Sequence, residues 1–241
     1  AWKAIAAGKH TFIEKPIEVS YSTALPILDA AEKADVVVTV GHVLRYFGMY
    51  RKAHDVVKSG QLGKPAAVRM SRTGIMPGGV NNWFGDHSLS GGVFIDLAVH
   101  DFDWLLWTLG PAKSVFAKSI GATTGQGKDY GLATIEFEIG ALAHVEASWM
   151  ETEAGRTAFE VCGSEGMLEY DSRNVPTLRQ GNSLEQHHLP DDDPFYLQLL
   201  NFVRAAQGES AQAVTVREAC EALRLAEAAL ESAKTGQLVN L

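Results

Sequence analysis

Five strand-like segments in the second half of this 241-residue chain constrain its fold more than any other feature. They cover residues 113–121, 130–138, 142–150, 156–163 and 166–171. Apolar and polar residues alternate along stretches such as 134–139 and 143–149, which is typical of strands with one buried face. Short turns at 139–141 and 163–166 indicate antiparallel hairpins. We therefore expect a large, mainly antiparallel sheet with one face packed on helices and the other facing water or a second subunit.

The remaining segments after residue 45 complete an α+β domain. Helical patterns predict helices at 50–59, 92–109, 194–206 and 216–234. A further strand is expected at 66–72, with weaker strands near 175–188. Residues 74–92, which hold many Gly, Asn, Ser and Asp, predict a long loop, and such loops usually carry function. We assign residues 46–241 to this α+β domain.

The first 45 residues show a different order of predicted helices and strands. A helix ending at Gly8 precedes a short buried strand at 11–14, a helix capped by Ser20, and a continuous apolar strand at 36–40. Alternating helices and strands are typical of a doubly wound α/β fold. Two strands are too few for such a sheet, and its glycine-rich phosphate-binding motif is absent. Residues 1–45 therefore show the pattern of a doubly wound unit but are too short to complete one.

Charge and composition disfavour several classes of function. The formal charge is 21 − 29 = −8 at pH 7 without a basic cluster, which argues against nucleic-acid binding. No apolar run reaches the roughly 18 residues of a membrane span, and the first residues do not resemble a signal peptide. Cys162 and Cys220 lie far apart without metal-binding spacing. We expect two reduced thiols and a cytoplasmic protein.

The predicted helix at 92–109 carries the first candidate site residues. At 100° per residue, Asp96, His100, Asp103 and Trp107 fall within about 60° of one another, opposite an apolar face. A carboxylate and an imidazole at i and i+4 can share a hydrogen bond, which fixes the tautomer and raises the basicity of the imidazole. Such a pair suits a general base, but an ordinary solvated helix face explains the same spacing.

The tripeptide Glu14-Lys15-Pro16 ends the first predicted strand. Ligands of open α/β sheets bind at the carboxyl ends of strands, where an ammonium group can orient a sugar hydroxyl and contact a cofactor. A surface lysine in a turn is the alternative, with Glu14 paired to Lys15 or to a backbone amide.

This tripeptide and the stretch from Gly91-Gly92 to His100 occur in order, with the strand at 36–40 and Arg45 between them. In this arrangement the chain resembles the glucose-fructose oxidoreductase/inositol dehydrogenase (Gfo/Idh/MocA) family of NAD(P)-dependent oxidoreductases nearly from end to end. The resemblance implies hydride transfer between NAD or NADP and a hydroxyl or ketone of a polyol, sugar or cyclitol. It also implies a homo-oligomer. By this resemblance, residues 1–45 are the C-terminal remnant of the NAD(P)-binding Rossmann domain, and residues 46–241 are the substrate-binding and oligomerisation domain.

The resemblance implies roles for individual residues. His100 takes the hydroxyl proton, Asp96 orients and polarises, and Lys15 positions both substrate and cofactor, so these three are the implied catalytic and substrate-binding set. The implied cofactor contacts are Glu14, Lys15, Arg45 and Trp83. No metal is implied. The segment 41–46 departs from the family pattern at Val43, where Asn is frequent.

Two other functions stay open from the sequence. A non-catalytic sugar- or cofactor-binding regulatory protein can share this fold. A metal-dependent hydrolase can use clustered His and Asp side chains, although no spacing here is diagnostic of a metal. We also expect the chain to lack an N-terminal piece with the dinucleotide fingerprint, and by itself to bind nicotinamide cofactor poorly.

Overall fold

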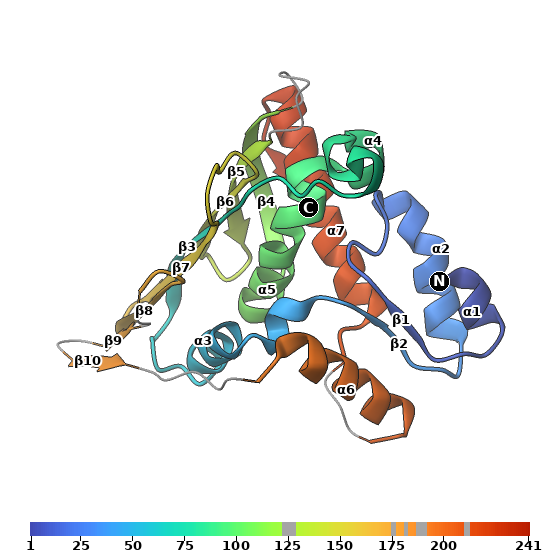
Figure 1. Cartoon of the computed structure of the whole chain (residues 1–241). Helices are drawn as coiled ribbons and strands as arrows, with labels where there is room; N and C mark the ends of the chain where they lie inside the picture. The colour runs from blue at the N-terminus through green and yellow to red at the C-terminus, as the bar shows by residue number, and fades with distance from the viewer. Residues whose placement is uncertain (122–128, 175–176, 181–182, 187–191, 210–212) are drawn as a thin grey trace.

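The computed structural model describes residues 1–121, 129–174, 177–180, 183–186, 192–209 and 213–241. They form a small unit with a parallel strand pair, next to a nine-stranded sheet with helices on one face (Figure 1). This arrangement confirms the predicted fold class, a partial Rossmann unit followed by an α+β domain with a large sheet.

The small unit is built by the first 40 residues. β1 (Thr11–Ile13) pairs in parallel with β2 (Val38–Val40), and Ile13 lies opposite Val40. α1 (Trp2–Ala6) precedes β1, and α2 (Tyr21–Lys33) connects the strands after its predicted cap, Ser20, whose hydroxyl accepts from the Thr23 amide. The prediction that the first strand is buried is wrong. β1 is only half-buried, because its second edge has no partner strand in the described part of the chain.

The large sheet has the strand order β10-β9-β8-β7-β3-β6-β5-β4-β11. The strands are β3 (Pro65–Thr73), β4 (Ala112–Ile120), β5 (Tyr130–Phe137), β6 (Leu142–Ser148), β7 (Arg156–Gly163), β8 (Gly166–Asp171), β9 (Thr177–Gln180), β10 (Ser183–Gln186) and β11 (Val239–Asn240). Neighbours are antiparallel except β3 and β6, which run parallel. The predicted strands are confirmed, and the remainder of the weak stretch near 175–188 lies outside the described residues. The insertion of β3 between β6 and β7 was not predicted, because local patterns do not encode distant pairing.

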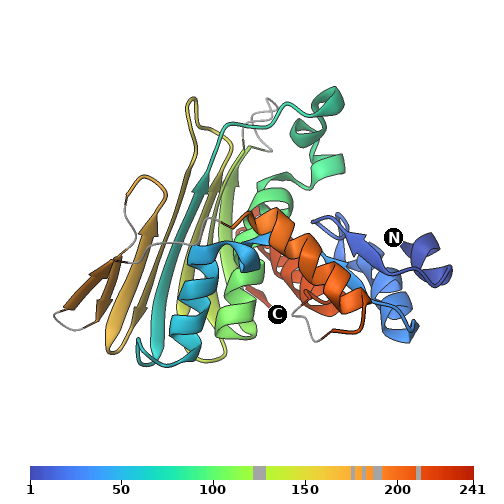
Figure 2. The ribbon, with the colours of Figure 1, turned by 60° about the horizontal axis from the view of Figure 1, so that its bottom comes forward.

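Helices cover one face of the sheet and leave the other bare, as predicted (Figure 2). α7 (Val216–Thr235) packs against β4 and against α5 (Val99–Leu109). α3 (Gly48–Lys58) and α6 (Pro194–Ala206) flank a short turn, η1 (Val43–Tyr46), that follows the small unit. Fully buried side chains of the core include Phe102, Trp104, Ile135, Val145 and Leu223.

The segment predicted as a long loop at 74–92 contains two short helical turns. They are η2 (Val80–Gly85) and α4 (His87–Ser90), and the Asp86 carboxylate caps α4 by accepting from the Ser88 amide. Gly91 and Gly92 both have φ of 75°, a conformation that glycine adopts without strain, and they turn the chain into the next helix.

The helix predicted at 92–109 is not a regular α-helix throughout. Its first part, η3 (Phe94–Ala98), is a π-helix that continues into α5. A π-helix has more residues per turn, so the 100° spacing used to predict a solvated polar face does not hold across it. The alternative of an ordinary solvated face is wrong for Asp96 and Asp103, because their side chains are buried with 8% and 1% of their surface exposed.

Two further predictions concern the thiols and the membrane. Cys162 and Cys220 are both free, the first partly exposed and the second buried. Among the residues that the structure describes, no helix combines the length and apolar character needed to traverse a bilayer.

Candidate active site

Lys15 joins the small unit to the buried helix. It follows the carboxyl end of β1, and its Nζ donates to the Asp96 main-chain oxygen at 2.7 Å and to Asp96 Oδ1 at 3.0 Å. The Lys15 side chain is 20% exposed, so its ammonium group is partly withdrawn from water. Charge-assisted bonds of this kind are short and strong. The structure thus brings together two predicted site residues that lie 81 positions apart.

The predicted hydrogen bond between Asp96 and His100 is not formed. Asp96 Oδ1 accepts from Lys15, and His100 Nδ1 is buried without a hydrogen-bond partner in the part of the chain that the structure describes. The π-helix explains the difference, because it moves Asp96 out of the α-helical i, i+4 relation to His100. Asp96 therefore positions Lys15 rather than the imidazole.

His100 is held as a neutral imidazole. Burial lowers the pKa of His100 well below its usual range, and the nearby charges of Lys15 and Arg72 lower it further. The expectation that a carboxylate raises its basicity is therefore wrong. A neutral imidazole with an unpaired nitrogen is nevertheless in the protonation state that accepts a hydroxyl proton.

His42 belongs to the same edge of the small unit, and we did not predict it as a site residue. It follows the carboxyl end of β2, its side chain is almost completely buried, and its Nδ1 also lacks a hydrogen-bond partner among the described residues. Its position after the strand at 36–40 repeats that of Lys15 after β1. That parallel was the signal in the sequence that could have identified it.

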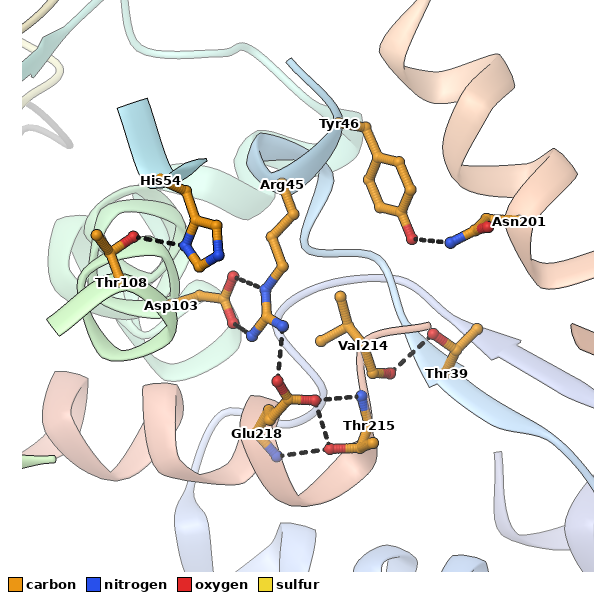
Figure 3. Close-up of polar contacts among 10 residues, drawn as sticks. All are labelled: Thr39, Arg45, Tyr46, His54, Asp103, Thr108, Asn201, Val214, Thr215 and Glu218. Carbon is orange, nitrogen blue, oxygen red and sulfur yellow. Dashed lines mark hydrogen bonds and ion pairs between the residues drawn. The ribbon is translucent and has the colours of Figure 1, made fainter. Parts of the chain in front are cut away.

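Arg45 lies at the centre of a polar network that connects three helical elements (Figure 3). Its guanidinium binds Asp103 of α5 in bidentate fashion, at 2.9 Å from Nε and 2.6 Å from Nη2. Its Nη1 binds Glu218 of α7 at 2.6 Å. Burial opposes the charge of Arg45, but Asp103 and Glu218 outweigh it and raise the pKa of Arg45 above its ordinary value.

The same network extends to β2. Glu218 Oε2 accepts from the Thr215 amide, and the Thr215 hydroxyl accepts from the Glu218 amide, which together form the capping box of α7. One residue earlier, the Val214 carbonyl accepts from the Thr39 hydroxyl at 2.8 Å and from the Val40 amide at 3.1 Å (Figure 3). Arg45, predicted as a cofactor contact, thus has its donors directed at carboxylates that fix the end of β2 against α5 and α7.

A second buried ion pair on the same helix was also not predicted. Asp101 of α5 binds Arg72 of β3 through two bonds of 2.7 Å each, and Arg72 also donates to the Tyr50 hydroxyl at 2.9 Å. Asp101 raises the pKa of Arg72 despite burial, which acts in the opposite direction. This pair attaches the helix to the middle of the sheet.

The remaining predicted cofactor contacts lie in different surroundings. Glu14 is exposed next to Lys15, and its Oε2 is close enough to Gly41 that a Cβ there would meet it at 3.0 Å. Trp83 lies in η2 with its ring edge-to-face on Phe84, at 4.9 Å between centroids. Within the described residues, no hydrogen bond, ion pair or ring contact connects Trp83 to Lys15, Asp96 or His100.

The acidic and histidine side chains around this site are paired with different partners. Asp86 caps α4, His87 lies 3.4 Å from Asp129, and Asp101 pairs with Arg72. Across the described ranges, no group of three or more His, Cys, Asp and Glu side chains is arranged to hold a metal ion.

Comparisons with known proteins agree with this architecture. Residues 1–42 match the model of the oxidoreductase family with an NAD-binding Rossmann fold, and residues 50–169 match the GFO/IDH/MocA C-terminal domain. The 1,5-anhydro-D-fructose reductase of Ensifer adhaerens is 30% identical over 99% of this chain and 74% of its own length. The myo-inositol 2-dehydrogenase of Thermotoga maritima is 26% identical over 98% of this chain and 73% of its own length.

Solved structures give the same result. GenD2 from gentamicin A biosynthesis, in complex with NAD, superposes with a TM-score of 0.84 at 25% identity over 99% of this chain and 73% of its own. The aldose-aldose oxidoreductase of Caulobacter crescentus shares the fold with a TM-score of 0.86 at 20% identity over 99% of this chain and 74% of its own. The fold and these relatives are those of an NAD(P)-dependent oxidoreductase. The chain belongs to the GFO/IDH/MocA family.

The residues present fit the reacting end of such a cofactor site. Lys15 offers an ammonium group at the carboxyl end of a parallel strand, where dinucleotides bind in α/β sheets. His100 contributes a buried ring nitrogen without a partner. Glu14 and Lys15 are the residues that we expect to hold the nicotinamide end of the cofactor.

Proposed function

We propose that this protein interconverts a hydroxyl group and a ketone on a sugar or cyclitol. The contact between Lys15 and Asp96, beside the neutral and unpartnered imidazole of His100, is the observation that carries this proposal. It gathers an oriented cation and a proton acceptor at the carboxyl ends of β1 and β2. The named relatives act on 1,5-anhydro-D-fructose and myo-inositol, which supports a polyhydroxylated substrate for this chain.

Each residue has a distinct role in this proposal. His100 accepts the proton of the reacting hydroxyl in the oxidative direction and returns it in the reductive one. Lys15, held by Asp96, donates a hydrogen bond to the same oxygen. The bound dinucleotide supplies the hydride acceptor or donor. Glu14 and Lys15 hold its nicotinamide end, whereas the contacts of Arg45 and Trp83 with cofactor stay predictions.

A substrate panel tests the proposal. The full-length protein is assayed with NAD and NADP against myo-inositol, scyllo-inositol and D-xylose, and in the reductive direction against 1,5-anhydro-D-fructose, by the absorbance of the reduced nicotinamide. We expect saturable turnover of at least one compound, and loss of that turnover in the His100→Ala variant. Absence of turnover with every compound in both cofactors contradicts the proposal.

Two outcomes of the same assay identify the alternative functions. Saturable polyol binding by calorimetry without any turnover indicates a non-catalytic binding protein. Activity that a chelator removes indicates a metal-dependent reaction. Turnover that persists in chelator and depends on nicotinamide cofactor supports the oxidoreductase.

We further propose that the protein is a homo-oligomer that pairs through the bare face of the large sheet. Exposed apolar side chains project from β4, β5 and β6 on that face, among them Phe116, Leu132 and Leu142. Charges of both signs lie beside them, with Arg69 paired to Glu160 and Arg156 to Asp171. A surface with both apolar and oppositely charged groups can complement a second copy of itself.

A further inference from the structure

His42 is a second buried imidazole at the edge where Lys15 and His100 lie. Its side chain is 1% exposed, and its Nδ1 has no hydrogen-bond partner among the described residues. Buried polar atoms in native proteins are nearly always hydrogen-bonded, so an unpaired one calls for an explanation such as a bound ligand. No role follows for this side chain from the reaction as proposed above.

The strand register places His42 beside Lys15. Ile13 lies opposite Val40, and the Gly41 amide donates to the Ile13 carbonyl at 2.8 Å, so the pairing continues beyond the strands. Lys15 and His42 each lie two residues beyond these paired positions, just outside the strands. The charge of Lys15 is close enough to His42 to lower its pKa. The segment before His42 lies against β1, because a Cβ at Gly41 would come within 3.2 Å of the Phe12 ring.

The surroundings of His42 keep it uncharged. Burial lowers its pKa most, Asp103 opposes this effect, and Arg45 and Lys15 lower the pKa further, while Glu218 raises it slightly. His100 is the second imidazole near it, and it is neutral for similar reasons. A neutral imidazole has one donor and one acceptor, which matches a hydroxyl group. A phosphate or carboxylate would favour the protonated ring, which burial opposes.

We propose that His42 binds a second hydroxyl of the substrate, on the carbon next to the one that reacts, so that the substrate class is a vicinal diol. This proposal rests on the proposed function. Lys15 and His100 serve the reacting oxygen, and His42 lies one strand away from Lys15, which suits the neighbouring oxygen. The network of Arg45, Asp103 and Glu218 holds the segment that carries His42 against the helix that carries His100.

Paired changes in enzyme and substrate test this assignment. The value of kcat/KM is measured for the best substrate of the panel and for its monodeoxy analogues, each lacking one hydroxyl, with wild type, His42→Ala and His42→Gln. The control is His144→Gln, an exposed histidine on the bare sheet face that is hydrogen-bonded to Thr134. The histidine ring NMR signals are followed in parallel during titration with myo-inositol without cofactor.

We expect His42→Ala to lower kcat/KM roughly 10-fold for the parent substrate, which corresponds to the loss of about one hydrogen bond. For the one analogue that lacks the hydroxyl bound by His42, kcat/KM should be the same in His42→Ala as in wild type. Glutamine, which keeps a donor and an acceptor, recovers part of the loss. An equal loss with every analogue overturns the proposal, because it indicates a structural role. If wild type turns over no polyol, the proposed function fails. The NMR titration then decides: a saturable shift of the His42 signals supports the contact, and unchanged signals overturn it.

Discussion

Ion pairs between buried carboxylates and cations fix the positions of single residues at this site. Each buried carboxylate of the helix is paired with a cation from a different segment: Asp96 with Lys15, Asp101 with Arg72, and Asp103 with Arg45. His100 lies between these pairs and keeps a ring nitrogen unpaired among the described residues. In the proposed reaction, proton transfer therefore falls to the imidazole, and the carboxylates orient cations.

Replacement of His100 by alanine removes the proposed proton acceptor. We expect kcat to fall by roughly 10²–10⁴-fold, the usual contribution of general base catalysis. The dissociation constant for NADH, measured by fluorescence, should change little because His100 is assigned to the substrate. A variant that retains the wild-type kcat and the same acidic limb of the pH–rate profile would exclude His100 as the base.

The two buried imidazoles make the fold sensitive to acid. Burial lowers the pKa of both His42 and His100 in the folded protein, so below the ordinary histidine pKa of about 6.5 the unfolded chain binds protons that the folded one does not. The free energy of unfolding should therefore fall as pH decreases through 6.5 toward the lowered values. Urea unfolding at pH 7.5 and 5.5 measures the effect. His100→Gln should reduce the pH dependence, and exposed His144→Gln should leave it unchanged.

Arg45 connects helical elements that lie far apart in the sequence. It links η1 to α5 through Asp103 and to α7 through Glu218, and the residues before the α7 cap bind β2. The small unit and the sheet domain are thus joined by directed polar bonds. A bidentate guanidinium pair is rigid, so this connection fixes the orientation of the helix that carries the site.

Loss of one partner in this connection leaves a buried charge. Asp103→Asn should lower the free energy of unfolding by roughly 3–5 kcal/mol, as is typical when one side of a buried pair is removed. The matched control is Arg69→Met, which breaks the more exposed pair with Glu160 on the bare face and should cost at most about 1 kcal/mol. If the two changes lower the free energy of unfolding equally in urea, the buried pair of Arg45 and Asp103 contributes no more to stability than the exposed pair.

The start of the helix that carries Asp96 and His100 packs against a glycine of β5. A Cβ at Gly131 would meet the Phe94 ring at 2.7 Å, and Phe94 opens the π-helix that carries Asp96. Gly131→Ala should destabilise the protein by roughly 1–3 kcal/mol through overpacking and should also lower kcat, because Asp96 moves with the helix. Gly74→Ala, which has open space around its Cβ, is the control. Unaltered turnover in Gly131→Ala would show that catalysis does not depend on the position of this helix.

The molecule as a whole presents two unlike sides. Helices and the small unit lie on one side of the large sheet, and the opposite face is bare (Figure 2). Leu132 and Leu142 remain 42% and 46% exposed there. Because apolar side chains gathered on one face favour association, the bare face is where we expect a second copy.

Light scattering tests that assembly. The wild-type protein at micromolar concentration should have the mass of a dimer or a larger oligomer, and Leu132→Arg should reduce it by placing a charge in the contact. Leu199→Arg changes a comparably exposed leucine on α6, away from this face, and should leave the mass unchanged. A monomeric wild type would contradict the proposed assembly.

Local patterns in the sequence were sufficient for most elements of this fold. Alternation identified the strands between 113 and 171, and the cap at Ser20 marked the start of α2. The place of β3 and the bond between Lys15 and Asp96 depend on contacts across large sequence separations, which no local pattern contains. The partner of Asp96 is Lys15 and not the predicted His100, because the prediction assumed 3.6 residues per turn and Asp96 lies in a π-helix.

The central position of β3 has a consequence for synthesis of the protein. The strand is complete at Thr73, but its two neighbours begin only at Leu142 and Arg156. The middle of the sheet therefore emerges from the ribosome long before anything can pair with it, and long-range pairing of this kind is slow. During that interval both edges of β3 are open to other chains. Slower translation at lower temperature should therefore change the yield of folded protein even where its final stability is unaltered.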